Sequence, residues 1–146
     1  MAVSIYRKNG PVHVEFYPKA ASTAIAFGEP VYLNTDGRLA PYTPAVAGPF
    51  LGLCKKEIAA TDDDFASTTR IPVEVGNAET EYVITASSTS AGATDVGEYC
   101  DYVEATVSVN VGSSSADDFY VTQVISTTLV VGKFARRIVS KSATLE

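Results

Sequence analysis

The feature that most constrains the fold is an alternation of apolar and polar residues with a period of two. Residues 12–17 place Val12, Val14 and Phe16 on one side of an extended chain, and residues 70–75 and 106–111 repeat the pattern. Successive side chains of a strand point to opposite faces, so this period indicates β-strands rather than helices. Eight Tyr, six Phe and frequent Val, Ile and Thr also suit a pleated sheet surface.

Turn residues divide the chain into short strands. Asp36-Gly37 lies between two short apolar runs, which favours a hairpin with a type I′ turn. Gly52 predicts a bulge or a close backbone approach, and Pro72 predicts an edge strand because proline cannot donate to a ladder. The last third of the chain predicts four strands, at residues 98–103, 105–111, 118–125 and 128–134.

These patterns predict an all-β fold, a mainly antiparallel β-barrel or sandwich-like domain. A chain of 146 residues is long enough to bury its own core. Residues 18–146 are expected to form this single β domain. Residues 1–17 are expected to form an extended N-terminal arm or a hairpin that turns at Asn9-Gly10. Residues 20–26 are the one stretch with helical character, and they predict a loop with at most one helical turn.

Charge and hydropathy exclude several classes of partner. The formal net charge is −6 and the sequence pI is near 4.7, whereas binding to a phosphate backbone needs clustered Lys and Arg. No apolar run approaches the roughly 18 residues of a membrane span, and the N-terminal residues do not resemble a signal peptide. Cys54 and Cys100 are expected to be small buried hydrophobic residues rather than a disulfide framework.

The sequence offers few groups that could carry out chemistry. His13 is the one histidine, and without a partner at a catalytic spacing it is expected to be a surface or interface residue. Asp62-Asp63-Asp64 lacks the alternating spacing of a calcium loop and is expected to be solvated. The motifs of nucleotide-binding and hydrolytic enzymes, including trimeric nucleotide hydrolases of the dUTPase type, are not found. We therefore expect a non-enzymatic protein with no cofactor and no catalytic or metal-binding residues.

Two groups of segments occur in a characteristic order. The first is the strand, Asp-Gly turn and short strand of residues 28–41, followed by the Leu-Gly strand of residues 49–53. The second begins at residues 96–102 and continues with residues 118–121 and 128–134. In this order the segments resemble the capsid decoration, or cement, proteins of tailed bacteriophages. The Ser/Thr-rich loop at residues 86–94 has no place in that pattern.

This resemblance implies a β-barrel-like subunit that forms a homotrimer and binds the major capsid protein. It implies a position on the outer capsid surface, at three-fold or quasi-three-fold points, after assembly in the host cytoplasm. There the protein would bridge neighbouring capsomers and stabilise the expanded shell. Contact with nucleic acid or with a membrane is not expected.

The N-terminal segment is the expected contact region. An extended arm could add a strand to an exposed sheet edge of the capsid protein or of a neighbouring subunit. Four tyrosines, at positions 6, 17, 32 and 42, are either interface anchors or ordinary outward residues on strands. The candidate capsid or subunit contacts are Val3, Ile5, Tyr6, Val12, Val14, Phe16 and Tyr17.

Two other classes of function remain open. One is a different structural subunit of a virion, such as a tail-tube, head-completion or fibre-base protein. The other is a soluble binding module, for example a carbohydrate-binding sandwich. The chain contains no Trp, which disfavours a sugar-binding platform.

Overall fold

The computed structural model describes residues 5–43, 49–77, 79–87 and 89–135, and it confirms the all-β fold. Two 3-10 helices, η1 (Ala93–Asp95) and η2 (Glu104–Thr106), interrupt the strands of this part of the chain. The strands are β1 (Ile5–Asn9), β2 (Val12–Pro18), β3 (Pro30–Leu33), β4 (Leu39–Pro41), β5 (Phe50–Cys54), β6 (Arg70–Gly76), β7 (Glu81–Ala86), β8 (Tyr99–Val103), β9 (Ser108–Asn110), β10 (Phe119–Ser126) and β11 (Leu129–Phe134).

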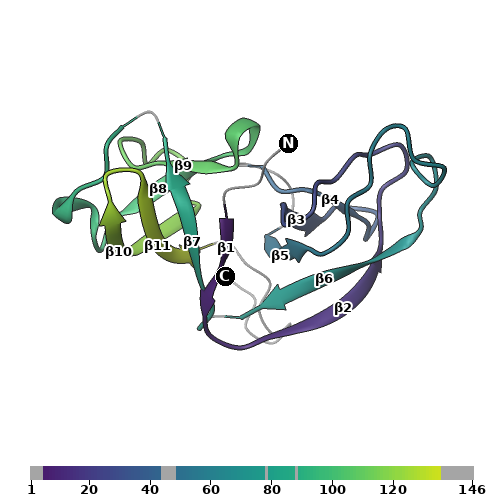
Figure 1. Cartoon of the computed structure of the whole chain (residues 1–146), viewed down its shortest axis with the longest axis horizontal. Coiled ribbons are helices and arrows are strands. Elements are labelled where there is room, and N and C mark those ends of the chain that lie inside the picture. The colour runs from purple at the N-terminus through teal and green to yellow at the C-terminus, as the bar shows by residue number, and fades with distance from the viewer. Residues whose placement is uncertain (1–4, 44–48, 78, 88, 136–146) are drawn as a thin grey trace.

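One half of the molecule is a closed β-barrel. Its sheet has the strand order β1-β7-β11-β10-β8-β9, and β9 also pairs in parallel with β7. This additional pairing closes β7, β11, β10, β8 and β9 into a mixed five-stranded barrel, with β1 attached outside the ring along β7 (Figure 1). The predicted barrel is therefore confirmed.

The other half is a separate antiparallel sheet with the order β2-β6-β5-β3-β4. Figure 1 shows it beside the barrel, with β2 and β6 forming a long curved ribbon along its lower side. This sheet has its own apolar core, distinct from that of the barrel. The buried residues of this second core are Ile25, Val31, Leu39, Leu51, Cys54, Ile58, Ile71 and Val73.

A cluster of aromatic rings joins the two halves. Tyr42 and Phe50 come from the second sheet and its connection, yet they belong to the same buried cluster as the barrel residues. Phe50 stacks on Phe134 of β11 with ring centroids 3.9 Å apart, and the Tyr42 hydroxyl donates a hydrogen bond of 2.8 Å to the buried carboxylate of Asp118. The sequence suggested that Tyr42 is either an interface anchor or an outward residue. Both suggestions are wrong, because Tyr42 is fully buried. It is a core residue that holds the barrel against the second sheet.

Of the two alternatives expected for residues 1–17, an extended arm or a hairpin, the hairpin is wrong, because β1 and β2 do not pair with each other. β1 pairs with β7 in the barrel sheet, and β2 pairs with β6 in the second sheet. Strands β6 and β7 follow one another in the chain, so residues 5–18 run antiparallel to them across both sheets. Gly10 makes the bend with φ of +97°, where a side chain would collide with the backbone of Glu79 and Thr80. The N-terminal segment is therefore an edge strand of each sheet.

Most of the turns and close approaches predicted from local sequence are present. Residues 34–38 do connect a hairpin between β3 and β4, but only Gly37 among them has a positive φ, so the loop is not a type I′ turn. Its Asn34 carbonyl accepts from the Gly37 N–H, and the Asn34 side chain accepts from two further backbone N–H groups. Gly52 does mark a close approach, to the carbonyl group of Glu74, beside a register shift in the pairing of β3 with β5.

The prediction that Pro72 marks an edge strand is wrong, since β6 lies between β2 and β5. The carbonyl of Pro72 accepts from the Lys55 N–H, one residue beyond the end of β5. Within a strand, the N and the carbonyl of one residue point to the same side. The missing donor of Pro72 therefore falls at the very end of the pairing with β5, where it costs only the last possible bond, from residue 72 to the Lys55 carbonyl.

The four strands predicted in the last third are present with shifted boundaries. Residues 104–106 form η2 instead of the start of a strand, and Val107 then adopts a left-handed φ of +48°. After this turn β9 runs back antiparallel to β8, and its other side pairs in parallel with β7, which closes the barrel. Residues 20–26 form a loop, as expected.

Candidate functional site: an outward apolar face on β2

The pairing register fixes which way the side chains of β2 point. His13, Glu15 and Tyr17 lie opposite Val75, Val73 and Ile71. Residues directly opposite in an antiparallel pair share a face of the sheet, and Ile71 and Val73 are fully buried in the second core. The polar set of β2 therefore shares the core-side face of the sheet, but only Tyr17 packs against the core, at its edge, while His13 and Glu15 are exposed.

The apolar set of β2 lies on the opposite face. Val14 is 56 % exposed and Phe16 is 58 % exposed, and Val12 is half-buried. A half-buried strand normally turns its apolar side inward, so β2 has the reverse phase. Scattered apolar residues on a surface are common, but Val14 and Phe16 lie on one strand face and are both more than half exposed, so they form a small exposed apolar patch.

A buried lysine locks this register at the end of β2. Lys19 follows the last residue of the strand, and its Nζ donates to the carbonyls of Ala20, Phe65 and Ser67 at 2.7–3.0 Å. Its backbone N–H donates to the Thr69 carbonyl at 3.0 Å. All three donors of the buried ammonium group are satisfied. A slip of one residue would break this set of bonds and move Val14 and Phe16 to the other face.

A second lock lies at the start of β2. The hydroxyl of buried Thr80 donates to the Pro11 carbonyl at 2.6 Å and accepts from the Asn77 N–H at 2.9 Å. Together with the bend at Gly10, this contact fixes where β2 begins along β6. The outward apolar face is therefore determined at both ends of the strand.

The free edge of β2 adds a second means of attachment. β2 is the end strand of its sheet, and within the described ranges its outer edge has no ladder partner. Long edge strands with exposed apolar residues are templates for pairing with another chain. The combination of an open edge and an outward apolar face is what an added strand or a protein surface could use.

The other residues expected at the contact are divided between both halves. Tyr6 on β1 is exposed, but Ile5 beside it is buried in the barrel core, where it lies opposite Ile84. As a core residue, Ile5 cannot also be a surface contact, so that expectation is corrected. Val3 lies outside the described residues. Tyr32 is half-buried and packs edge-on against Tyr42 at 6.5 Å.

The structure adds residues of β6 that the sequence did not suggest as contacts. Gly76, Glu74 and Pro72 lie opposite Val12, Val14 and Phe16, and so they share the same face. These three residues are half-buried, because farther across the sheet this face turns to the barrel: Glu74 also lies opposite Leu53, which is buried in the barrel cluster. The sequence showed that these residues alternate with the buried residues of β6. It did not show that β2 is the strand that pairs with β6, and only this pairing places the residues of the two strands on one face. We name the face formed by these six residues the β2–β6 outer face.

The single histidine and the two cysteines of the sequence lie in surroundings that are ordinary for structural residues. His13 is exposed and lies 3.3 Å from the Glu15 carboxylate. Cys54 and Cys100 are buried, one in each core, and burial raises the pKa of their thiols to about 11 and about 12. Among the described residues, no group of three or more His, Cys, Asp or Glu side chains is arranged to hold a metal ion.

Asp101 on β8 holds the loop before β10. Its two carboxylate oxygens accept from the Ser113 hydroxyl and from the backbone N–H groups of Ser115, Ala116 and Asp117. Burial by itself would raise the pKa of Asp101, but these hydrogen bonds outweigh it and hold the pKa below its ordinary value. The ionised form is therefore favoured in the folded state, and its stabilisation is lost as pH falls through the folded pKa.

We expect Asp101→Asn to lower the free energy of unfolding at pH 7 by about 1–3 kcal/mol, because an amide nitrogen would face backbone donors. The difference between wild type and variant should shrink as pH falls through the lowered pKa of Asp101, where the aspartate protonates. Urea unfolding at pH 7 and pH 3 measures both. An equal difference at the two pH values would show that ionisation of Asp101 does not matter.

In the part of the chain that the structure describes, no helix has the length and apolar character needed to cross a membrane. No protein-family model matches this chain, and no curated protein matches it either.

Proposed function

We propose that this chain is a structural, non-enzymatic virion protein that binds the outer surface of a tailed-phage capsid. In this proposal a homotrimer sits at three-fold or quasi-three-fold positions and contacts the major capsid protein. It stabilises the expanded shell by bridging capsomers. The observation that carries the proposal is the β2–β6 outer face, which turns Val14 and Phe16 to solvent in a register locked at both ends.

The energetics of such attachment are compatible with this face. Burying an exposed Val or Phe side chain contributes about 1.5–3 kcal/mol. A specific interface usually needs more than about 1,000 Å² in total, so neighbouring residues and the strand edge would contribute as well. Three copies of a modest site in one trimer would bind with avidity, since the second and third contacts become intramolecular. Strong attachment then needs no reacting group.

Co-sedimentation with expanded and unexpanded phage shells tests the proposal. We expect the protein to pellet with expanded shells, because expansion creates the sites that bridge capsomers, and to remain in solution with unexpanded ones. The mass measured by light scattering should be that of three chains. A hexamer or a long polymer would favour a tail subunit, and a monomer that binds neither shell would contradict the proposal.

A further inference from the structure

The free edge of β2 carries a defined set of backbone hydrogen-bonding groups. In an antiparallel sheet, successive residues of a strand direct their N–H and C=O groups to opposite edges. The Lys19 N–H donates to the Thr69 carbonyl at 3.0 Å, in line with the pairing of β2 and β6. The odd-numbered residues of β2 therefore bond to β6. The even-numbered residues Val12, Val14 and Phe16 direct their backbone groups to the free edge.

One of these edge groups is already engaged by a side chain. The Phe16 carbonyl accepts from Nη1 of Arg70 at 3.1 Å. Pro72 lies opposite Phe16 and directs its own carbonyl to β5, which agrees with the phase of the ladder. The Phe16 N–H and both backbone groups of Val12 and Val14 have no partner within the described ranges. A strand laid along this edge would find these groups ready to pair.

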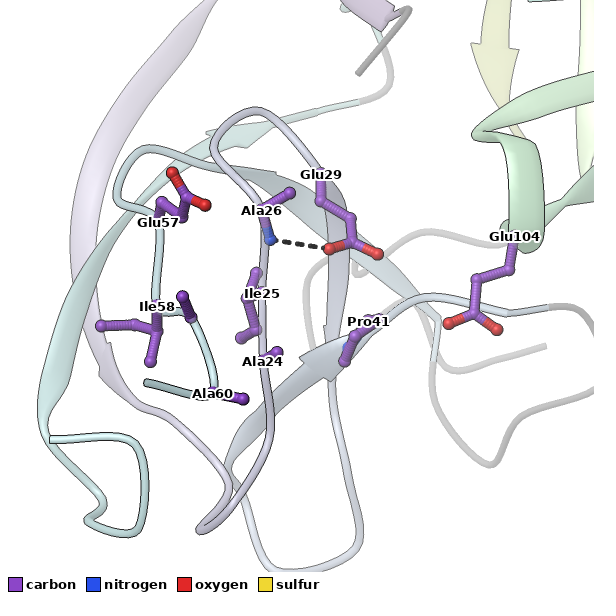
Figure 2. Close-up of a pocket in the computed structure, with 10 residues that line it drawn as sticks. Ala24, Ile25, Ala26, Glu29, Pro41, Glu57, Ile58, Ala60 and Glu104 are labelled. Carbon is purple, nitrogen blue, oxygen red and sulfur yellow. Dashed lines mark hydrogen bonds between the residues drawn. The ribbon is translucent and has the colours of Figure 1, made fainter. Parts of the chain in front are cut away.

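The opposite edge of the second sheet is not open in this way. Lys19 forms a bridge with Leu39 of β4, and the Ala20 N–H donates to the Leu39 carbonyl at 2.9 Å. Figure 2 shows residues 24–26, which follow this bridge and line one pocket together with Pro41, the last residue of β4. Among the described strands of this sheet, β2 is therefore the one that offers an open edge, along the rim of the molecule (Figure 1).

The sequence of β2 is complementary to itself in one antiparallel register. Residues that exchange hydrogen bonds across the free edge must come from the even-numbered set. When Val14 of one copy lies opposite Val14 of another, Val12 lies opposite Phe16. His13 then lies opposite Glu15 twice, at the positions where opposite side chains come closest. Both faces of such a pair are matched, because one is apolar throughout and the other carries alternating charges.

The two neighbouring registers that keep the same hydrogen-bonding phase are less favourable. A shift in one direction places Glu15 opposite itself, and like charges directly opposite are destabilising. A shift in the other direction places His13 opposite itself and moves Phe16 opposite Gly10, beyond the start of the strand. Only the register centred on Val14 retains the two His–Glu pairs. Charge complementarity therefore selects a second copy of β2 as the occupant and fixes its position.

We propose that two copies of this chain pair edge to edge through β2, antiparallel and related by a two-fold axis at Val14. The pair joins the exposed Val14 and Phe16 side chains of both copies into one continuous apolar patch. A two-fold contact closes with two chains and cannot build a three-fold ring. On a shell it would link neighbouring trimers. This consequence rests on the proposed function, whereas the pairing itself does not.

The contact is small, and this decides how it can be observed. Five paired residues span about 17 Å, and such an edge contact is smaller than the total of about 1,200 Å² at which stable interfaces begin. Chains are therefore expected to be unpaired through β2 in the dilute solution of a light-scattering measurement. They should pair when other contacts hold them side by side. A covalent trap captures such a weak pair.

The first experiment places one cysteine on the edge of β2 and follows disulfide-linked dimers of the full chain under mild oxidation. Two Val14→Cys chains would bring their Cα atoms about 5.5 Å apart, within the span of a disulfide. Two Val12→Cys chains, or two Phe16→Cys chains, would be four residues out of register and more than about 10 Å apart. Cys54 and Cys100 are buried and should stay unreactive.

We expect Val14→Cys to cross-link about tenfold faster than Val12→Cys or Phe16→Cys alone. A mixture of the latter two should cross-link as heterodimers, because positions 12 and 16 lie opposite each other in the pair. Gel electrophoresis without reducing agent measures these rates. Equal rates for the three single variants, with no gain in the mixture, would overturn the inference.

The second experiment reverses charges, with the Val14→Cys chain as the reference. In this background His13→Glu places two acidic side chains opposite each other, and Glu15→Lys places a lysine opposite the histidine. Each change should slow cross-linking about tenfold. An equal mixture of the two restores opposite charges at both positions, so heterodimers should form at close to the reference rate. A mixture no faster than its separate components would contradict the register.

The matched control for the charge changes is Glu98→Lys in the same background. Glu98 is exposed and lies outside β2, and its replacement alters the net charge as much as Glu15→Lys does. The cross-linking rate should stay within about twofold of the reference. Slowing equal to that of Glu15→Lys would show a general effect of charge and would contradict the local pairing.

Shell binding separates this inference from the proposed function. If wild-type chains pellet with expanded shells, while Val14→Cys chains cross-link neither in solution nor on the shells, the capsid proposal survives and the β2 pairing is wrong. If wild-type chains do not pellet, but Val14→Cys chains cross-link in solution, the proposed function fails and the pairing stands.

Discussion

Replacing Phe134 by alanine should destabilise the protein by about 3–5 kcal/mol, which is a large share of the total of about 5–15 kcal/mol that is usual for a domain. Phe134 is buried in the aromatic cluster that joins the barrel to the second sheet. Its ring stacks on Phe50 and meets Tyr42, Tyr82, Tyr102 and Phe119 edge-on, with ring centroids within 6 Å. Alanine would leave a cavity at the centre of this cluster.

Two control variants show whether packing is the cause. Phe134→Leu fills most of the space and should cost less than half as much as alanine. Tyr102→Phe keeps the neighbouring ring but removes a buried hydroxyl that has no hydrogen-bond partner among the described residues, so its stability should be unchanged or higher. Chemical unfolding followed by circular dichroism measures all three. A loss below about 1 kcal/mol for Phe134→Ala would contradict the role assigned to the cluster.

The second large effect concerns attachment. Changing both Val14 and Phe16 to glutamate should weaken binding to expanded shells at least 100-fold. The physical reason is that two apolar contacts, worth about 3–6 kcal/mol together, are replaced by charges that must be desolvated. Because both side chains are more than half exposed in the free protein, its stability should change by only about 0.5 kcal/mol per site.

The matched control for this variant places the same charges on another exposed apolar site. Val96 and Ile125 belong to the barrel half of the chain and are 47 % and 49 % exposed. Their double change to glutamate should leave shell binding within about twofold of wild type. Equal weakening by both double variants would point to a general effect of added negative charge, and no weakening by either would remove the β2–β6 outer face from the account.

The sequence was sufficient for the fold class and for most strands, because alternation and turn chemistry are local. The Asp36-Gly37 hairpin and the strands of the last third could be located in this way. The partners of β1 and β2 could not, since pairing depends on contacts far apart in the chain. For the same reason Pro72 suggested an edge, although β6 is an interior strand whose neighbour β5 has ended before that residue is reached.

The candidate surface was only partly predictable. Alternation at residues 12–17 shows two faces, but it does not show which face turns to the core. The sequence therefore grouped Ile5 with Val14 and Phe16, although Ile5 is buried and the other two are exposed.

Hydrogen–deuterium exchange on the shell-bound protein tests the central claim most directly. The account predicts that backbone amides of residues 12–18 become protected on binding to expanded shells, because β2 offers both its outer face and its free edge. Amides of β10 near Ile125 should exchange as they do in the free protein. Protection at β10 with no change along β2 would contradict the account.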